Sequence, residues 1–237
     1  MKKRGNRKKK RIVFAIVNGA LLLIMAACLI TTAILSNTLA SQKEASRWRG
    51  ESDMEFSQIS CFIPVDEKIG LEKVAAFRTK LTEELHKAAL DIDNDSTLFV
   101  DAWSCTGKVN VSSDNGKGEA AVIAVGGEFF DFHPIRLISG SYITQRDLMK
   151  DRVLLDEDLA WLLYGGTDIA GLSMKINGVP YMIAGVVERE QDKFNTAAYT
   201  SGRGLYMSYD GYSQLVEDAG ITCYELVMAN PVKDFAL

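Results

Sequence analysis

Residues 12–35 read IVFAIVNGALLLIMAACLITTAIL, a continuous apolar run without a charge. Only Asn18, Gly19, Thr31 and Thr32 interrupt it. At a helical rise of ~1.5 Å per residue the run spans ~36 Å, enough to cross a hydrocarbon core of ~30 Å. Because a backbone inside lipid has to satisfy its own hydrogen bonds, a single segment can cross only as a helix. We therefore expect residues 12–35 to form a transmembrane helix.

The charges around this run are sharply divided. Eight of the 27 Lys and Arg residues lie in the first eleven positions, and the rest of the chain carries 19 basic and 31 acidic residues. These eight are Lys2, Lys3, Arg4, Arg7, Lys8, Lys9, Lys10 and Arg11. Basic residues next to a membrane helix stay on the cytoplasmic side. We expect residues 1–11 to be a basic cytoplasmic head in a single-pass protein of the cell membrane, with residues 36–237 extracytoplasmic.

Two other interpretations of the apolar run are weaker. A cleaved signal peptide has an apolar core of about 7–15 residues followed by small residues at the cleavage site. This core is longer, and the nearest small-residue site, at Thr38 and Ala40, matches poorly. A buried helix of a soluble protein rarely needs so long an apolar segment. The pattern favours an uncleaved signal-anchor that lies in the lipid bilayer.

The remaining sequence predicts an α+β protein, with a mixed α/β extracytoplasmic domain in two lobes. Residues 36–50 are polar and predict a stalk, and residues 51–237 form the domain. A strand is expected over residues 53–63, with a bulge at Ser57–Gln58 and an end at Pro64. Apolar residues at three- and four-residue steps predict a helix over residues 71–88, and a strand follows over residues 96–103. This order is typical of a βαβ or split βαβ unit.

Local signals place the later elements. Asp156 is a good N-cap for a helix over residues 157–164, and Gly165 is a good C-cap. Asn177–Gly178 between two apolar stretches predicts a type I′ hairpin turn. A last helix is expected near residues 212–219. Further strands are expected over residues 108–112, 120–125, 152–155, 204–208 and 221–228.

No catalytic motif is present in the sequence. It contains no Gly-x-x-x-x-Gly-Lys-Ser/Thr loop for phosphates, no Gly-x-Ser-x-Gly elbow and no His-Glu-x-x-His pair. The two histidines, His86 and His133, have no second partner in sequence, so solvated or half-buried side chains are expected. We predict no catalytic, cofactor-binding or metal-binding residue, no cofactor, and a protein that is not an enzyme and binds no nucleic acid. The net charge of −4 agrees with the last point, because nucleic-acid modules carry strongly basic surfaces.

The cysteines show no Cys-x-x-Cys spacing, which argues against zinc or thioredoxin chemistry. Cys28 lies in the apolar run. Cys61, Cys105 and Cys223 lie outside it, and an odd number leaves at least one of them free. A disulfide between Cys61 and Cys105, at the strand ends of the expected βαβ unit, is one interpretation, and buried thiols are the other.

Two further clusters have both a structural and a functional interpretation. Asp91, Asp93 and Asp95 alternate as in a calcium loop, but the glycine and the terminal glutamate of such a loop are missing, which favours an acidic turn. Phe129, Phe130 and Phe132 follow a glycine pair. These aromatic side chains either face a ligand or wedge a turn into the core, and the second role is more common.

The order of these features resembles the extracytoplasmic core domain of MacB/FtsX-type ABC transporter permeases, over roughly residues 10–230. The resemblance rests on VGGEFFDFHPIRLISGSYI, residues 125–143, and on DRVLLDEDLAWLLYGGTDIAGLSMKINGVPYMIAGVVE, residues 151–188. The closing GLYMSYDGYSQL, residues 204–215, and YELVMANPV, residues 224–232, complete the pattern. Each motif is structural and weak alone, but their order and spacing are fairly specific.

The resemblance implies a permease component that works as a homodimer or heterodimer with a separate cytoplasmic ABC ATPase subunit, where ATP binds. In such transporters the outer domain couples ATP-driven motion of the membrane helices to the export or extraction of a substrate. Relatives carry three further membrane helices after this domain, and the sequence to Leu237 has no second apolar run. A partial permease and a single-pass relative both fit. The alternative function is a membrane-tethered binding or sensory module without transport activity.

Overall fold

The computed structural model describes residues 2–38, 43–50, 55–87, 99–188 and 203–230. The chain divides into two compact units, residues 1–43 and residues 44–237. The aspartates at positions 91, 93 and 95 lie outside the described residues. The second unit begins inside the segment expected to be a stalk.

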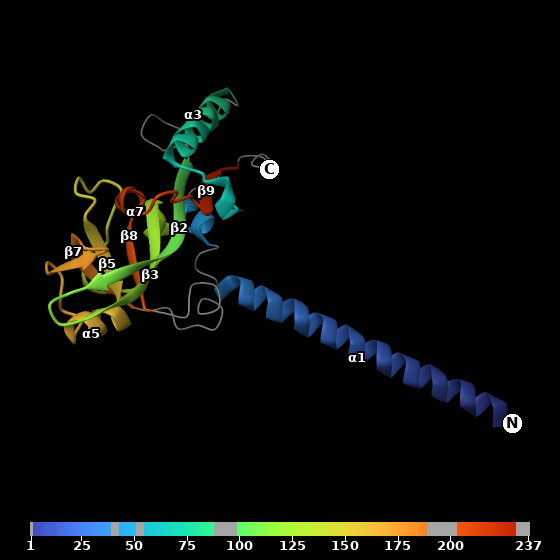
Figure 1. Ribbon diagram of the computed structural model, residues 1–237. Helices are drawn as coiled ribbons and strands as arrows, with labels where there is room; N and C mark the ends of the chain where they lie inside the picture. The colour runs from blue at the N-terminus through green and yellow to red at the C-terminus, as the bar shows by residue number, and fades with distance from the viewer. Residues whose placement is uncertain (1, 39–42, 51–54, 88–98, 189–202, 231–237) are drawn as a thin grey trace. The chain divides into compact units, whose positions relative to one another are not determined.

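The first unit contains one long helix, α1 (Lys2–Thr38) (Figure 1). Its segment Arg11–Leu35 is long and apolar enough to cross a membrane. The described part of the chain does not cover the large apolar side chains of this segment. The polar side chains in this segment bond to the helix's own backbone. Asn18 Nδ2 donates to the carbonyl oxygen of Phe14 at 2.8 Å, and Thr31 Oγ1 donates to that of Ala27 at 2.7 Å. These bonds satisfy the polar groups without a partner from outside the helix, as lipid requires.

The second unit is built on a nine-stranded mixed sheet, which confirms the α+β prediction. The strand order is β1-β9-β2-β3-β8-β5-β7-β4, and β6 pairs with β2 and β7. The strands are β1 (Phe56–Phe62), β2 (Phe99–Ser112), β3 (Lys117–Gly127), β4 (Leu137–Gly140), β5 (Arg152–Asp156), β6 (Ser173–Ile176), β7 (Val179–Val187), β8 (Gly204–Ser208) and β9 (Cys223–Ala229). The helices are α2 (Glu44–Arg49), the 3-10 turn η2 (Val65–Glu67), α3 (Leu71–Lys87), α4 (Phe129–Phe132), α5 (Glu157–Tyr164) and α7 (Tyr209–Leu215).

The expected strand–helix–strand unit is a split βαβ. Strands β1 and β2 both run antiparallel to β9, which lies between them. The bulge expected at Ser57–Gln58 is wrong, because the register runs without a shift from Phe56 opposite Ala229 to Phe62 opposite Cys223. The change of phase in the apolar pattern arises because β1 is an edge strand, where neither face is fully buried.

Strand β2 is longer than expected. Residues 99–103, the described part of the first expected strand, and residues 108–112, the second, belong to one strand, which pairs with β3 from Ala102 to Ser112 (Figure 1). The strand continues through Gly107, and the Tyr212 hydroxyl occupies the space where a side chain at this position would lie. A glycine that suggests a break in the sequence therefore marks a packing contact.

Several local predictions are confirmed. The Asp156 side chain caps α5 by accepting from the Leu159 amide at 2.7 Å, and Gly165 ends the helix with φ +72°. Asn177 and Gly178 both have positive φ, as a type I′ turn requires. The last helix is displaced toward the N-terminus: α7 begins at Tyr209 because the Ser208 hydroxyl accepts from the Gly211 amide and caps it.

The sheet carries a hydrophobic core on each face. The larger core packs residues of α3, α5 and α7 against one face, and the smaller core packs residues of α4 against the other. One continuous sheet runs through the domain, and residues 44–237 form one compact unit. The long β2–β3 hairpin contributes to both cores and makes the sheet continuous.

Candidate functional site

A groove of about 460 Å³ lies around the start of β2 and the β3–α4 turn. It is lined by Trp48, Arg78, Phe99, Val100, Asp101, Gly127, Glu128, Asp131, Thr144, Gln145 and Arg146. Its wall combines an exposed indole, two arginines and three carboxylates. Such a mixed lining suits a polypeptide segment better than a purely apolar ligand.

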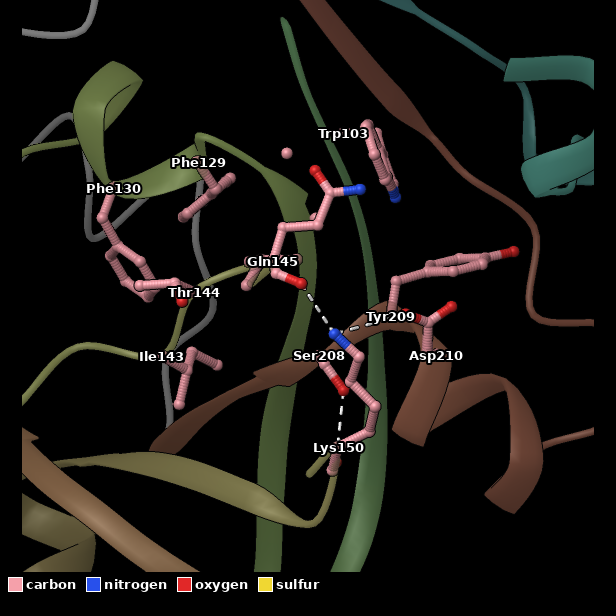
Figure 2. Close-up of a pocket in the computed structure, with 13 residues that line it drawn as sticks. Trp103, Phe129, Phe130, Ile143, Thr144, Gln145, Lys150, Ser208, Tyr209 and Asp210 are labelled. Atoms are coloured by element: carbon pink, nitrogen blue, oxygen red, sulfur yellow. Dashed lines mark hydrogen bonds and ion pairs between the residues drawn. The ribbon is translucent and has the colours of Figure 1, made fainter. Parts of the chain in front are cut away.

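A second, much smaller cavity of about 30 Å³ shares Gly127, Thr144 and Gln145 with the groove (Figure 2). Figure 2 shows the Lys150 ammonium pointing at the backbone oxygen of Gln145, to which it donates at 2.9 Å. The same ammonium lies 4.0 Å from an Asp210 carboxylate oxygen. These contacts hold the loop between β4 and β5 against the start of α7.

Glycines at the end of β3 shape this region. At Gly126 a Cβ would lie 2.3 Å from the ring of Trp103, so only glycine lets the indole lie against the strand. Gly127 has φ +66°, and a Cβ there would meet the Asp101 carbonyl oxygen at 2.2 Å. The glycine pair thus allows the sharp turn into α4 and the close packing of β2.

A buried ionic cluster forms the floor of the groove. Asp101 is only 4% exposed, and it accepts from Arg78 Nε at 2.7 Å and from the Tyr224 hydroxyl at 2.6 Å. Arg78 Nη2 bonds to the other carboxylate oxygen, and its guanidinium stacks 4.8 Å from the Trp103 ring centre. The hydrogen bond to Asp101 raises the pKa of Arg78, so its charge is permanent. The cluster ties α3 to the sheet.

A second cluster fastens α2 to the same domain. Glu44 is 3% exposed and pairs with Arg47. Arg47 Nη2 also donates to the Asp131 carbonyl oxygen of α4 at 2.7 Å, and the Glu44 amide donates to the Gln58 side chain of β1 at 3.2 Å. Burial raises the pKa of Glu44, and the arginine opposes that shift. Residues 44–49 are therefore anchored to the domain rather than being a free stalk.

A third cluster joins α4 to β9 and β1. His133 Nε2 lies 2.5 Å from a Glu225 carboxylate oxygen, and the Ser60 hydroxyl lies 3.1 Å from the other oxygen. The carboxylate lies between the serine and the imidazole, so the histidine is not placed to activate the hydroxyl. Among the described residues, no group of three or more His, Cys, Asp or Glu side chains is placed to hold a metal ion.

The chain thus combines a helix suited to a membrane with a sheet domain to which α2 and α3 are fastened. The model of the MacB-like periplasmic core domain matches residues 14–234 of the chain. The chain belongs to this family. The match begins within the apolar segment of α1 and continues to the end of β9, so it includes both units.

Three solved structures that match the chain in a structural comparison are domains of ABC-type transporters and of a permease protein. The extracellular domain of the noncanonic ABC-type transporter YknZ from Gram-positive bacteria is 14% identical, with a TM-score of 0.47 over 75% of this chain and 85% of that one. The periplasmic region of MacB from Actinobacillus actinomycetemcomitans is 16% identical, with a TM-score of 0.45 over 60% and 63%. A domain of a putative permease protein from Porphyromonas gingivalis is 18% identical, with a TM-score of 0.38 over 61% and 66%. No curated protein matches the chain in sequence.

In the MacB-like domain the two histidines lie on different elements, and the three phenylalanines lie in or beside the smaller core. His86 is exposed at the end of α3, and His133 is half-buried beside Glu225. Phe129 and Phe132 are buried in the smaller core, and Phe130 packs on Tyr142 with ring centres 5.1 Å apart. The aromatic cluster wedges the turn into the core, and Phe129 and Phe130 also line the small cavity.

The disulfide between Cys61 and Cys105 is wrong in this MacB-like fold. All four cysteines are free thiols. Cys105 is buried in β2, whereas Cys61 is exposed on the edge strand β1. Strand β9 lies between the two strands, so the cysteines do not face each other. Burial raises the pKa of the Cys105 and Cys223 thiols to about 12.

The ionic clusters were not predicted from the sequence. Arg78 and Asp101 are 23 residues apart, and Asp101 and Tyr224 are 123 residues apart. The only sequence signal is an aspartate in the middle of an apolar strand, FVDAW, where a charged residue needs a partner. That signal points to a buried ion pair without identifying the arginine.

Proposed function

We propose that the chain is the membrane-anchored permease component of an ABC transporter. Its outer domain couples ATP-driven movement of the membrane helices to the export or extraction of a substrate. Its N-terminus lies in the cytoplasm and residues 36–237 lie outside. It works as a homodimer or heterodimer with a separate cytoplasmic ATPase subunit that binds ATP, and its own domain catalyses no reaction and holds no cofactor.

One observation carries this proposal: the family match begins inside α1 and extends through the whole ectodomain. A domain that merely shared the sheet would match only after the helix. The basic residues before Ile12 and the acidic balance after it support the orientation.

The attachment of α2 supports mechanical coupling. A force on the chain before Glu44 acts on α2. In α2, Arg47 is hydrogen-bonded to α4 and the Glu44 amide is hydrogen-bonded to β1. Displacing α2 from the domain would break these two hydrogen bonds, which join it to α4 and β1. Movement of the anchor would thus reach the smaller core through α2 and α4.

Co-purification with the ATPase subunit tests the partner. The full chain, co-expressed with candidate ATPases and extracted in a mild detergent, is expected to elute together with one of them. The control variant carries an unrelated single membrane helix in place of residues 12–35 and should elute without the ATPase. A full chain that elutes alone whichever ATPase is co-expressed would contradict the proposal.

The coupling is tested by inserting a flexible Gly/Ser stretch after Lys43. A fluorophore on Cys61, which is exposed, reports changes in the outer domain when ATP is added to the complex. The insertion should abolish the fluorescence change while ATP hydrolysis continues, because a flexible linker does not transmit force. The same stretch inserted after Leu148, which is 97% exposed, is the matched control and should leave the change intact. An unaltered change in the first variant would refute the coupling.

A second candidate is a membrane-tethered binding or sensory module without transport. The groove beside Trp48, with its arginines and carboxylates, favours this candidate. If it is correct, Trp48→Ala and Arg146→Ala should weaken capture of a cell-envelope peptide while no ATPase co-purifies. Co-purification of an ATPase would decide for the permease.

A further inference from the structure

Strand β1 is one end of the nine-stranded sheet. It pairs with β9 on one side, and no other described strand lies on its second side. The opposite end of the sheet, β4, has only four residues and a register shift between Leu137 and Ser139. Short length and irregular pairing protect an edge from joining another chain. Strand β1 has seven residues, regular pairing and no such protection.

The sequence of β1, FSQISCF, contains no charge and no proline. Natural edge strands usually carry lysine or proline, which prevent pairing with another strand. Phe62 at the end of β1 is 83% exposed, although it is among the largest apolar side chains in the domain. An uncharged edge with an exposed phenylalanine is the pattern of a strand that pairs with a partner.

The backbone of β1 presents alternate residues to the open side. The Glu55 carbonyl oxygen accepts from the Asn230 amide at 2.7 Å, and the Ile63 amide donates to the Thr222 oxygen at 2.8 Å. Odd-numbered residues therefore direct their backbone groups toward β9. In an antiparallel ladder the alternate residues, including Phe56, Ser60 and Phe62, direct theirs away from it.

We propose that the β1 strands of two copies of this chain pair antiparallel about a two-fold axis at Ile59 and join two sheets into one. In this register Phe56 lies opposite the partner's Phe62, Gln58 opposite the partner's Ser60, and Ser57 opposite the partner's Cys61. The even-numbered pairs are the hydrogen-bonded ones, in agreement with the direction of their backbone groups. Pro64 and Glu55 fall outside the seven paired residues.

A second copy fits this edge better than an unrelated strand, because the sequence is complementary to itself in this register. The two exposed or half-buried phenylalanines face each other at both ends, and aromatic cross-strand pairs stabilise a sheet. Small polar residues face each other between them. The two chains are also held in one membrane, which raises their local concentration. The pairing gives the proposed permease dimer a contact outside the membrane, and rests on that proposal.

Cysteine cross-linking of the full chain tests the register. Ser57→Cys, in a Cys28→Ala background, places a thiol opposite the partner's Cys61 in a non-hydrogen-bonded pair with a Cα separation of about 4.5 Å. That separation lies within the range that a disulfide spans. Mild oxidation in membranes should give a covalent dimer on a non-reducing gel. The variant with Cys61→Ser added should lose it, and Ser213→Cys, an exposed position on α7, should not form it.

A charged residue at the edge of β1 is a second test of the pairing, and it is combined with the Ser57→Cys cross-link. Phe62→Lys places two positive charges in the paired region and should abolish the covalent dimer formed by Ser57→Cys. Val65→Lys, at a residue that is 69% exposed and outside the ladder, should leave the dimer yield unchanged. The β1 contact is overturned if Ser57→Cys forms no covalent dimer. It is also overturned if the yield of covalent dimer is the same with and without Phe62→Lys. The ATPase co-purification would then still stand, because a dimer held only by α1 does not need this edge.

Discussion

Arg78 of α3 donates two hydrogen bonds to Asp101 of β2 at the floor of the groove, and the carboxylate is 4% exposed. The guanidinium also stacks on Trp103, so a single side chain links α3, β2 and the groove wall. This pair makes α3 part of the sheet domain, although the helix presents few buried residues of its own.

Replacing Arg78 with leucine should destabilise the domain by about 2–3 kcal/mol, because it leaves a buried carboxylate without its cation. The lower part of the usual range applies, since the arginine side chain is itself 34% exposed. Urea unfolding followed by tryptophan fluorescence measures the loss. Lys80→Leu, on an exposed position of the same helix, is the control and should change stability by less than about 0.5 kcal/mol. Equal effects of the two substitutions would show that the pair contributes nothing.

The domain should lose stability when the pH rises above about 10, and Tyr224 is expected to cause part of this loss. Burial, together with the hydrogen bond to Asp101, raises the pKa of the Tyr224 hydroxyl above its ordinary value of 10.0. The unfolded chain then releases this proton at a lower pH than the folded chain does. Proton release from the unfolded state lowers the free energy of unfolding as pH increases.

The measurement for Tyr224 is the urea midpoint at pH 8 and at pH 11 for the native chain and for Tyr224→Phe. The variant is expected to be less stable at pH 8, by about 1 kcal/mol, because it loses the hydrogen bond to Asp101. Its further loss between pH 8 and pH 11 should be smaller than that of the native chain. Parallel pH profiles for the two proteins would contradict the assignment to Tyr224.

Asp156 should be the most sensitive capping residue of the domain. One carboxylate oxygen accepts from the Leu159 amide at 2.7 Å and the other accepts from the Gly204 amide at 2.6 Å. Asp156→Ala removes the cap of α5 and leaves the β8 amide without this acceptor, for an expected cost of about 2–3 kcal/mol. Asp156→Asn keeps one oxygen and should lose about half as much. Thermal unfolding of the two variants measures the difference, and equal losses would assign the whole effect to a single bond.

The cysteines should differ strongly in reactivity. A membrane-impermeant maleimide added at pH 7.5 is expected to modify Cys61, which is exposed, and to leave Cys105 and Cys223 unmodified. Burial protects these two and raises their pKa to about 12, so the reactive thiolate is scarce. Mass spectrometry with and without urea identifies the labelled sites. Modification of Cys105 without urea, or a Cys61 that reacts only after reduction, would contradict the structure.

Much of the local structure follows from signals within a few residues of each other. The 24 uncharged residues from Ile12 predict the helix α1, and Asp156 and Gly165 predict both ends of α5. Asn177–Gly178 predicts the β6–β7 turn. These predictions succeed because capping, turn chemistry and transfer into lipid depend on the residue type and its nearest neighbours.

The errors have a common physical cause. The sequence predicts two strands that end and begin on either side of residues 104–107, but one strand continues through Gly107, where the hydroxyl of Tyr212, from a distant helix, fills the space beside the glycine. The apolar pattern of β1 suggests a bulge, but the strand is regular because it lies at the edge of the sheet. In both cases the neighbours that determine the conformation are remote in sequence.

By itself the amino-acid sequence determined that one segment suits a bilayer, that a strand–helix–strand unit follows, and that no familiar catalytic motif is present. Only the tertiary structure decided that β9 separates β1 from β2, that Asp101 meets Arg78 and Tyr224, and that no other described strand pairs with the second edge of β1. The reason is that the distribution of charges beside an apolar segment, or the cap of a helix, depends on residues that are adjacent in sequence. The choice of strand neighbours and buried ion partners depends instead on many weak contacts across the whole sheet, and no short stretch of sequence contains them.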